Sequence, residues 1–416
     1  MDNIIFKYEV FYLLDQEAFL SGFVAKFQSM VYFEERKKRM KNKFFTVVII
    51  LAIALFLAPA SWGQQQQQQE QKYEFKIDCQ VKRTPAKSQG ATSTCWCFAG
   101  TSLLESECIR KTGQEIELSE MFTVRHVYPR KADNFIRLRG AATFGGGSMP
   151  FHVPMSVMVN GIVPDEVYSG LQPDQTRHNH RQLHTELQAT LEPAFKTGIT
   201  QEWQKEFTDI LDKHLGEPPQ SFKYNGKTYT PQTFAQDALQ LDMNDYIVIS
   251  SFTHHPFYQR FRLEVNDNFD YYDDFYNVPL DELEQIADYA LKNGYSFVWN
   301  GDISEPGWKS RQGYAVIDDP NSEDPGKELK VNQEIRQEGF DHRKTTDDHA
   351  MHTVGMAHDQ EGNKYYLTKN SSGSDGPYEG HVYISCSYTR AKMLFMVVNR
   401  NAVPQDFARK LRIIRR

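Results

Sequence analysis

The fold is decided by the stretch Lys87-Ser88-Gln89-Gly90-Ala91-Thr92-Ser93-Thr94-Cys95-Trp96-Cys97-Phe98-Ala99-Gly100. Small and polar residues lead into a Cys-Trp pair, and the pattern from Cys95 to Lys111 predicts a helix that ends before Gly113. Cys95 would stand in the first turn of this helix, where the partial positive charge of the N-terminus favours thiolate over thiol. Gln89 lies six residues upstream and offers an amide donor. A thiol and an amide donor directed at one point are two components of an acyl-transfer site.

The rest of the predicted site lies far along the chain, in two strands. Residues 349–357 and 364–369 show strand patterns and are separated by the turn Gln360-Glu361-Gly362-Asn363. Such a hairpin would bring His349 and Asn370 together at one end. Asn370 would accept a hydrogen bond from one ring nitrogen of His349 while the other faces Cys95, which is the Cys-His-Asn version of a catalytic triad.

Each of these residues also has a structural interpretation. Cys95 alone could be a buried thiol at a helix start, and His349 alone could be a structural histidine in a strand. The combination of Cys95 with Gln89, and of His349 with Asn370, favours the catalytic interpretation. The run Gly145-Gly146-Gly147-Ser148 fits equally well a turn and a surface against which an extended peptide could lie.

Helical and strand patterns are segregated along the chain. Helical periodicity dominates the early part and strand alternation the last third, which predicts an α+β fold with two lobes and a cleft between them. A hairpin with an Asn225-Gly226 turn is expected at residues 222–229. Helices are expected at residues 95–111, from 119 onward, 149–159, 180–215 and 280–292, and strands at 247–249, 261–265, 296–299, 313–317, 349–357, 364–369, 381–385 and 393–398.

These motifs together resemble the papain-like cysteine peptidases. Gln89, Cys95-Trp96, Asp348-His349-Ala350 and Lys369-Asn370-Ser371 stand in the order and context of that family. The long interval between Cys95 and His349 is similar to that of the bleomycin hydrolase and aminopeptidase C branch, which carries a helical insertion. Further similar stretches are Leu118 to Phe122, Tyr224 to Pro231, Ser251 to Tyr258, Asn300 to Ser304 and Asn401 to Pro404.

The resemblance implies a papain-like two-lobe fold, with a helical lobe, an antiparallel β lobe and a helical insertion at about residues 175–240. It implies peptide substrates, no cofactor, no metal and a homo-oligomer, a hexamer in that branch. It also implies one role for each site residue: Cys95 as nucleophile, His349 as base and then acid, Asn370 as orienter of His349, Gln89 and the Cys95 backbone amide as oxyanion hole, and Gly146 and Gly147 beside the substrate backbone.

Three departures from the family pattern bear on activity. Ser372 replaces the tryptophan that shields the Asn-His hydrogen bond from water, so His349 should be oriented less well. Thr92 replaces the disulfide cysteine before the nucleophile. Bleomycin hydrolases use the C-terminal tail to fill the cleft and select free N-termini, but this tail is basic and ends Arg415-Arg416, so exopeptidase behaviour does not carry over directly.

The N-terminal region has the pattern of a signal peptide. A basic start at Met40, an apolar core of about fifteen residues and small residues near Gly63 predict secretion, either periplasmic or extracellular. Translation starting at Met40 is the simpler interpretation of residues 1–39; a genuine extension with an uncleaved membrane anchor is the alternative. The expected organisation is 1–39 extension, 40–63 signal peptide, 64–72 Gln-rich linker, 73–405 catalytic domain and 406–416 basic tail.

Other functions receive little support from the sequence. The net charge of -7 and the pI near 6.0 argue against nucleic acid as a partner. His254 and His255 would face opposite sides of a strand, so a metal site there is not expected. The acidic run 266–274 lacks the turn glycine of a calcium loop and is expected to be a solvated loop.

The predicted function is therefore that of an exported cysteine peptidase, most simply an aminopeptidase, acting through a thioester acyl-enzyme. The alternative is a catalytically weakened homologue that binds peptides, which Ser372 favours. An acyltransferase that uses the same thioester is a third hypothesis.

Overall fold

The computed structural model describes residues 73–323 and 327–415. Tyr73–Arg416 form one compact unit. The extension, signal peptide and Gln-rich linker expected before residue 73 lie outside the described residues. Within the described part of the chain, no helix has the length and apolar character needed to cross a membrane.

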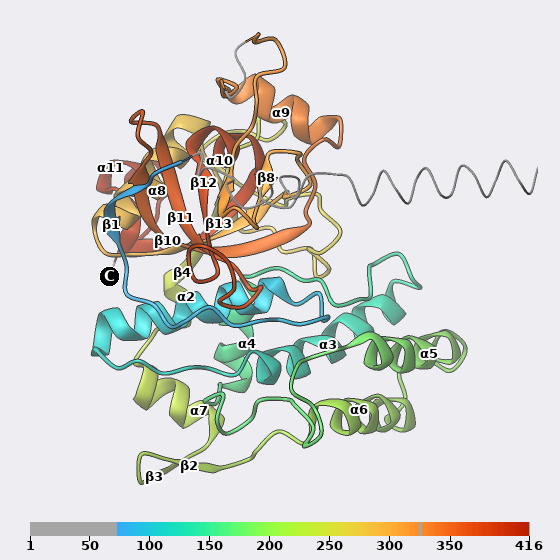
Figure 1. Cartoon of the computed structure of the whole chain (residues 1–416). Coiled ribbons are helices and arrows are strands. Elements are labelled where there is room, and N and C mark those ends of the chain that lie inside the picture. Colours follow the sequence, from blue (N-terminus) through green and yellow to red (C-terminus); the bar gives the residue numbers. More distant parts are fainter. Residues whose placement is uncertain (1–72, 324–326, 416) are drawn as a thin grey trace, which may run out of the picture. The chain divides into compact units, whose positions relative to one another are not determined.

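The first part of the unit is helical (Figure 1). Its two longest helices have clear local signals: Gly113 ends α2 in the left-handed region at φ 73°, and Ser119 caps α3 by accepting from the backbone N–H of Phe122. The Asn225-Gly226 hairpin forms as expected. The elements are α2 (Cys95–Thr112), α3 (Glu120–Arg137), α4 (His152–Asn160), α5 (Arg181–Thr197), α6 (Gln201–Leu215), β2 (Phe222–Tyr224), β3 (Lys227–Tyr229), α7 (Pro231–Phe234), a π-helix (Ala235–Leu239) and a 3-10 helix (Met243–Asp245).

The second part is built on one mixed sheet of eleven strands, in the order β5-β6-β4-β13-β7-β10-β11-β12-β9-β8 with β1 paired to β10. Most neighbouring strands are antiparallel, but β4 with β6 and β12 with β9 are parallel. The strands are β1 (Lys76–Gln80), β4 (Tyr246–Ser250), β5 (Arg260–Phe261), β6 (Phe275–Asn277), β7 (Phe297–Gly301), β8 (Trp308–Lys309), β9 (Tyr314–Ala315), β10 (His349–His358), β11 (Lys364–Lys369), β12 (His381–Ser385) and β13 (Met393–Asn399).

Helices α8 (Leu280–Lys292), α9 (Gln333–Asp341), α10 (Cys386–Lys392) and α11 (Gln405–Leu411) accompany the sheet, and a 3-10 helix (Arg400–Ala402) follows β13. Helix α11 includes part of the basic tail. Ile413, which follows it, is buried in the same apolar cluster as α8. The tail is thus anchored to the sheet part of the unit.

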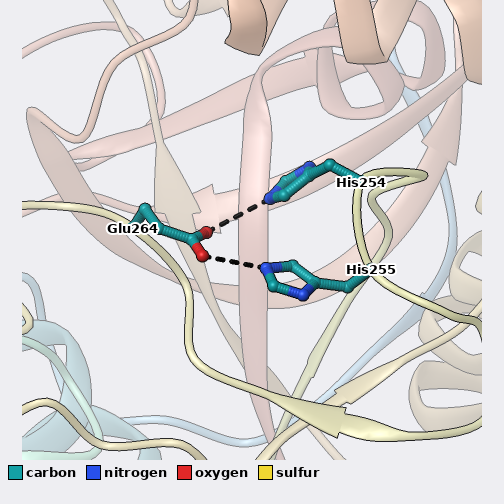
Figure 2. Close-up of side chains that lie close together, drawn as sticks. All are labelled: His254, His255 and Glu264. Atoms are coloured by element: carbon teal, nitrogen blue, oxygen red, sulfur yellow. Dashed lines mark hydrogen bonds and ion pairs between the residues drawn. The ribbon is translucent and has the colours of Figure 1, made fainter.

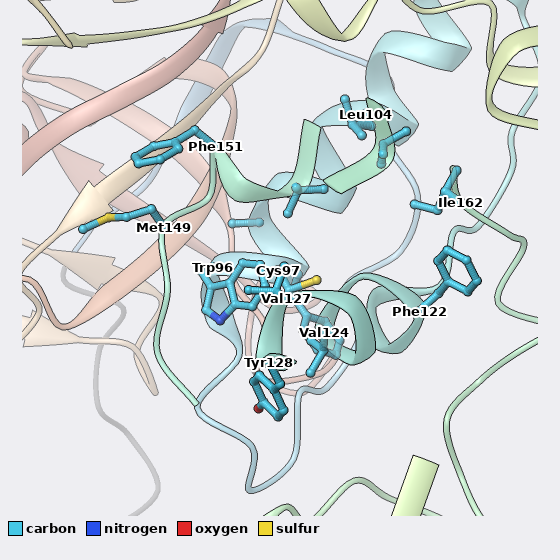
Figure 3. Packing of buried hydrophobic residues seen from close by; sticks show 14 of the residues in the cluster. Trp96, Cys97, Leu104, Phe122, Val124, Val127, Tyr128, Met149, Phe151 and Ile162 are labelled. Atoms are coloured by element: carbon cyan, nitrogen blue, oxygen red, sulfur yellow. The ribbon is translucent and has the colours of Figure 1, made fainter. Parts of the chain in front are cut away.

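Helix α2 lies between the two parts and contacts β10 as well as α3 and α4. Its apolar side chains are buried over most of its length, as expected for a central helix. Figure 3 shows Trp96, Cys97 and Leu104 of α2 among side chains from α3 and from the segment around Met149 and Phe151. This packing gives rigid support to the first turn of α2, and therefore to Cys95.

The predicted α+β fold is confirmed, with two refinements. The sheet is mixed rather than purely antiparallel, because β6 and β9 each pair in parallel with a neighbour. The strand expected at 261–265 shrinks to Arg260–Phe261, because the chain then turns into a loop held by the side chain of Asn268, which donates to the carbonyl oxygen of Leu263.

Candidate active site

The structure places Cys95 as the first residue of α2; the residue is half-buried, and its Sγ atom lies at the buried end of the side chain. Burial raises the pKa of Cys95 to about 12; the backbone amide of Ala350 opposes this shift and the carboxylate of Asp347 adds to it. The stabilisation of thiolate that the helix N-terminus was expected to provide is therefore outweighed by desolvation in the free protein. In this state the Cys95 side chain is a neutral thiol.

His349 and Asn370 meet at one end of the β10–β11 hairpin, as the sequence predicted. Nε2 of His349 lies 2.8 Å from Oδ1 of Asn370. Oδ1 also accepts from the backbone N–H of Ser371 at 2.8 Å, which identifies it as the acceptor atom. Nε2 of His349 must then carry the proton, and Nδ1 keeps the lone pair that a general base needs.

Burial lowers the pKa of His349, and its hydrogen bond to Asn370 opposes that shift only in part. The imidazole is consequently neutral beside a neutral thiol. Within the described residues, no hydrogen bond joins Sγ of Cys95 to the His349 ring, but Sγ is stabilised by the amide of Ala350, the next residue along β10. Such loose geometry is common in catalytic sites without substrate.

Gln89 is held by the strand that carries Asn370. Its backbone N–H donates to the carbonyl oxygen of Ser371 at 2.9 Å, and its Oε1 accepts from the Ser371 hydroxyl at 2.7 Å. Because Oε1 is used in this way, Nε2 is left as the donor that an oxyanion would need. Ser88 and Ser372 pair as an isolated β-bridge beside this contact.

The glycine run lies next to the nucleophile. The indole N–H of Trp96 donates to the carbonyl oxygen of Gly146 at 2.9 Å. A Cβ atom at Gly146 would overlap the carbonyl oxygen of Thr92, and one at Gly147 would overlap the carboxylate of Asp267. Gly146 therefore needs glycine because backbone lies against it, beside the first turn of α2, whereas at Gly147 the neighbouring group is a side chain that could move.

A buried ionic network supports the site from behind. Lys87 forms an ion pair with Glu120 at 2.7 Å, and Nζ of Lys369 lies 4.0 Å from Glu105, whose side chain is fully buried. Burial alone would lower the pKa of Lys87, but Glu120 and Glu105 raise it above its usual value. Lys87 and Lys369 immediately precede the segments of Gln89 and Asn370, so this network fixes both segments against α2 and α3.

Sequence reasoning missed two acidic residues close to the thiol. Asp267 comes from the loop between β5 and β6, and Asp347 lies two residues before His349. Burial raises the pKa of Asp347 to about 7, and Asp267 contributes to the same shift. The acidic run gave the only available signal for Asp267, and its expected exposure is only partly right, since Asn268 and Phe269 are buried.

His254 and His255 lie in a loop after β4 rather than in a strand, and both rings point to Glu264 (Figure 2). The expectation that they face opposite sides is wrong because the chain turns there. Nε2 of His254 lies 3.2 Å from one carboxylate oxygen of Glu264, and Nε2 of His255 lies 2.9 Å from the other.

Gln337 determines which ring nitrogen of His254 carries the proton. Its Oε1 accepts from the backbone N–H of Thr253 at 2.6 Å, so its Nε2 donates to Nδ1 of His254 at 2.9 Å. His254 therefore carries its proton on Nε2 and directs that proton, not a lone pair, to Glu264. The arrangement favours a hydrogen-bonded clamp between the loop and α9 over a metal site.

Comparison with known proteins gives a consistent family assignment. The profile of the Peptidase C1-like family matches residues 153–413, more than half of the chain. The match includes His349 and Asn370 but begins after Gln89 and Cys95, so the placement of these two residues rests on the geometry above.

Two curated relatives come from Lactobacillus delbrueckii subsp. lactis. Aminopeptidase G is 26% identical over 207 residues and aminopeptidase W is 25% identical over 212 residues. These alignments cover 46% and 47% of this chain and the same shares of the relatives, so the chain spans about half the length of the curated relatives it matches.

Among solved structures, PepW from Lactobacillus rhamnosis superposes with a TM-score of 0.66 at 17% identity. The superposition covers 88% of this chain and 94% of PepW. At that identity the likeness concerns the fold, and it extends over nearly the whole described unit.

Proposed function

Since the chain belongs to the Peptidase C1-like family, we propose that it is a cysteine peptidase that acts on the N-termini of peptides. The observation that carries this proposal is that the end of the β10–β11 hairpin positions both His349 and Gln89. Asn370 holds His349 through a hydrogen bond, and Ser371 holds Gln89. Cys95, at the start of α2, lies beside Ala350 of the same strand.

The proposed reaction begins when Nδ1 of His349 takes the proton from Sγ of Cys95. The sulfur attacks the substrate carbonyl carbon, and the carbonyl oxygen becomes an oxyanion that Nε2 of Gln89 and the Cys95 backbone amide stabilise. The tetrahedral intermediate collapses to a thioester as His349 returns its proton to the leaving amine. Water, deprotonated by His349, then attacks the thioester carbonyl; the C–S bond breaks, the new carboxylic acid leaves and ionises in water, and His349 returns its proton to Sγ of Cys95.

In the free protein Cys95 and His349 are both neutral, and this affects the first proton transfer. Burial makes the thiolate and the imidazolium each unfavourable alone, so the proton should move only when the pair and the substrate stabilise both charges. We therefore expect alkylation of Cys95 by iodoacetamide to be slow in the free protein at pH 7 and to become faster as pH rises, because only the thiolate reacts.

The test uses the full-length chain and fluorogenic peptides with free and acetylated N-termini. Cys95→Ala should lower turnover by about a thousandfold or more, the scale seen when a catalytic nucleophile is removed. Cys79→Ala is the matched control, since that thiol is also half-buried and lies in β1. Unchanged turnover in Cys95→Ala would refute the proposal.

A second candidate function is peptide binding without efficient hydrolysis. Ser372 is exposed and leaves the His349–Asn370 bond only partly shielded, and the thiol pKa of about 12 disfavours attack. This candidate predicts that peptides bind with equal affinity to the unchanged chain and to Cys95→Ala, while neither chain turns them over. An acyltransferase would be recognised by amine acceptors that outcompete water for the thioester.

Export and assembly belong to the same proposal. The basic and apolar pattern at residues 40–63 supports secretion, and N-terminal sequencing of the mature protein from its native host would test it. Mass photometry of the purified chain would test the hexamer that the family resemblance implies. A full-length N-terminus or a monomer would contradict these two statements without affecting the chemistry.

A further inference from the structure

Two carboxylates, from different segments of the chain, lie near Cys95. Asp267 comes from the β5–β6 loop, and its carboxylate packs against Gly147, where a Cβ atom would overlap it. Asp347 comes from the sheet side, where Nδ2 of Asn300 donates to its Oδ1 at 2.7 Å. Oδ2 of Asp347 is buried and has no hydrogen-bond partner among the described residues. A buried acceptor of this kind is costly unless a ligand satisfies it.

The loop that carries Asp267 is held firmly. Asp270 lies between Arg130, at 3.1 Å, and the buried ring of His152, at 3.0 Å. The side chain of Asn268 closes the loop by accepting from the backbone N–H of Tyr272 at 2.9 Å and donating to its carbonyl oxygen at 2.9 Å. Asp267 is therefore presented to Gly147 by a fixed scaffold.

The two carboxylates lack a counter-charge of their own. Among residues 73–323 and 327–415, no lysine, arginine or histidine nitrogen lies within 4.0 Å of either one. The nearby cation, Lys131, uses its Nζ to donate to the carbonyl oxygens of Gly145 and Gly147. Beside the effect of burial, Asp267 contributes to the raised pKa of Asp347, and both carboxylates contribute to the raised pKa of Cys95, so the three groups are near one another.

The C-terminal tail does not reach this place. It is fastened where β13 ends: Arg415 donates to the carbonyl oxygen of Asn401, and Ile413 is buried beside α8. His349 pairs with Gly301, which pairs with Met393 at the opposite end of β13. The tail and the thiol are thus separated by the length of a seven-residue strand, roughly 20 Å. The described part of the tail therefore supplies no cation to these carboxylates.

We propose that Asp267 and Asp347 form the subsite that binds the protonated N-terminal amine of the substrate, and so make the enzyme selective for free N-termini. This inference rests on the proposed peptidase function. The α-nitrogen and the first carbonyl carbon of a peptide are two bonds apart, about 2.5 Å. An ammonium held beside Asp267 and Asp347 therefore brings the first carbonyl group close to Cys95.

The direct test is binding to a chain that cannot turn over. In full-length Cys95→Ala, trialanine amide should bind at least about tenfold more tightly than its N-acetylated form, measured by calorimetry at pH 7. Adding Asp267→Asn or Asp347→Asn should reduce this ratio to below about threefold, since asparagine keeps the shape and loses the charge. Asp273→Asn, an exposed carboxylate of the same loop, should leave the ratio unchanged.

The outcomes separate this inference from the proposed function. Equal binding of the two peptides, or a ratio that survives both substitutions, would overturn the amine subsite even if the enzyme hydrolyses peptides. A ratio that depends on Asp267 and Asp347, together with no hydrolysis of either peptide by the chain that keeps Cys95, would support the subsite and refute the peptidase. If Asp267→Asn weakens only N-acetylated peptides that begin with lysine, the subsite recognises side chains and the inference is wrong.

Discussion

The helical side of the site is fixed from several directions, whereas the sheet side holds its base by a single hydrogen bond. Gln89 is tied through its backbone and its side chain to Ser371, and Trp96 locks the helix start to Gly146. Among residues 73–323 and 327–415, the His349 ring has Asn370 as its one hydrogen-bond partner, next to the exposed Ser372. Under the proposed mechanism, Cys95 and Gln89 are therefore rigidly preorganised, and the orientation of His349 is the feature on which the rate most depends.

The largest expected effect beyond loss of the nucleophile comes from the rigid side. Gln89→Ala should lower kcat by about 10²–10³-fold with little change in KM, because the donor acts on charge that develops only in the transition state. Gln89→Glu keeps the size of the side chain and an acceptor oxygen for Ser371 but has no N–H donor, so it should lose as much. Steady-state kinetics on a free N-terminal substrate measure both. A loss confined to KM would show that Gln89 binds substrate and is not part of the oxyanion hole.

On the sheet side the expected loss is smaller. Asn370→Ala should lower kcat by about 10–100-fold, because His349 loses its orienting acceptor while the nucleophile and oxyanion donor remain. Asn370→Asp preserves the acceptor for His349 and Ser371 and should recover much of the rate. The pH dependence of kcat should also change in Asn370→Ala. In the unchanged chain, the hydrogen bond to Asn370 opposes the lowering of the His349 pKa by burial, and the alanine variant loses that hydrogen bond. If Asn370→Ala lowers kcat more than Gln89→Ala does, the contrast between the two sides of the site is reversed.

Local signals explain how much of this could be predicted from the sequence. The helix at Cys95, the Ser119 cap and the β10–β11 hairpin depend on neighbouring residues, and each was found within a few positions. Asp267 and Asp347 were not recognised, because 80 positions separate them and only tertiary packing places both beside Cys95. The pKa of the Cys95 thiol was expected to fall because the sequence shows the helix N-terminus that would lower it. The burial that raises it depends on tertiary packing and is not visible in the sequence.

A third effect concerns stability rather than rate. Folding raises the pKa of Asp347 to about 7 by burial, so between about pH 4 and pH 7 the folded chain binds more protons than the unfolded chain. The free energy of unfolding should therefore fall as pH rises through that interval. Asp347→Asn removes this cost and should raise the free energy of unfolding by about 1–2 kcal/mol at pH 8, with no gain near pH 4.

Thermal midpoints of the full-length chain at pH 4 and pH 8 measure this difference. Asp273→Asn, on an exposed carboxylate, is the control and should shift neither midpoint. A loss of stability in Asp347→Asn at pH 8 would mean that the carboxylate already has a cationic partner in the folded chain. That result would count against the electrostatic strain on which the amine subsite depends.

The smallest expected effect tests the weak point of the sheet side directly. Ser372 is exposed and its backbone pairs with Ser88, so a tryptophan side chain can be added there without displacing a buried group. Ser372→Trp should shield the His349–Asn370 bond from water and raise kcat by about threefold, because a hydrogen bond strengthens as the local dielectric falls. Ser374→Trp places the same ring at another exposed position of the same loop and should have no effect. An equal gain in both variants would indicate general loop stiffening, and a loss in Ser372→Trp alone would show that the open position admits substrate rather than weakening the base.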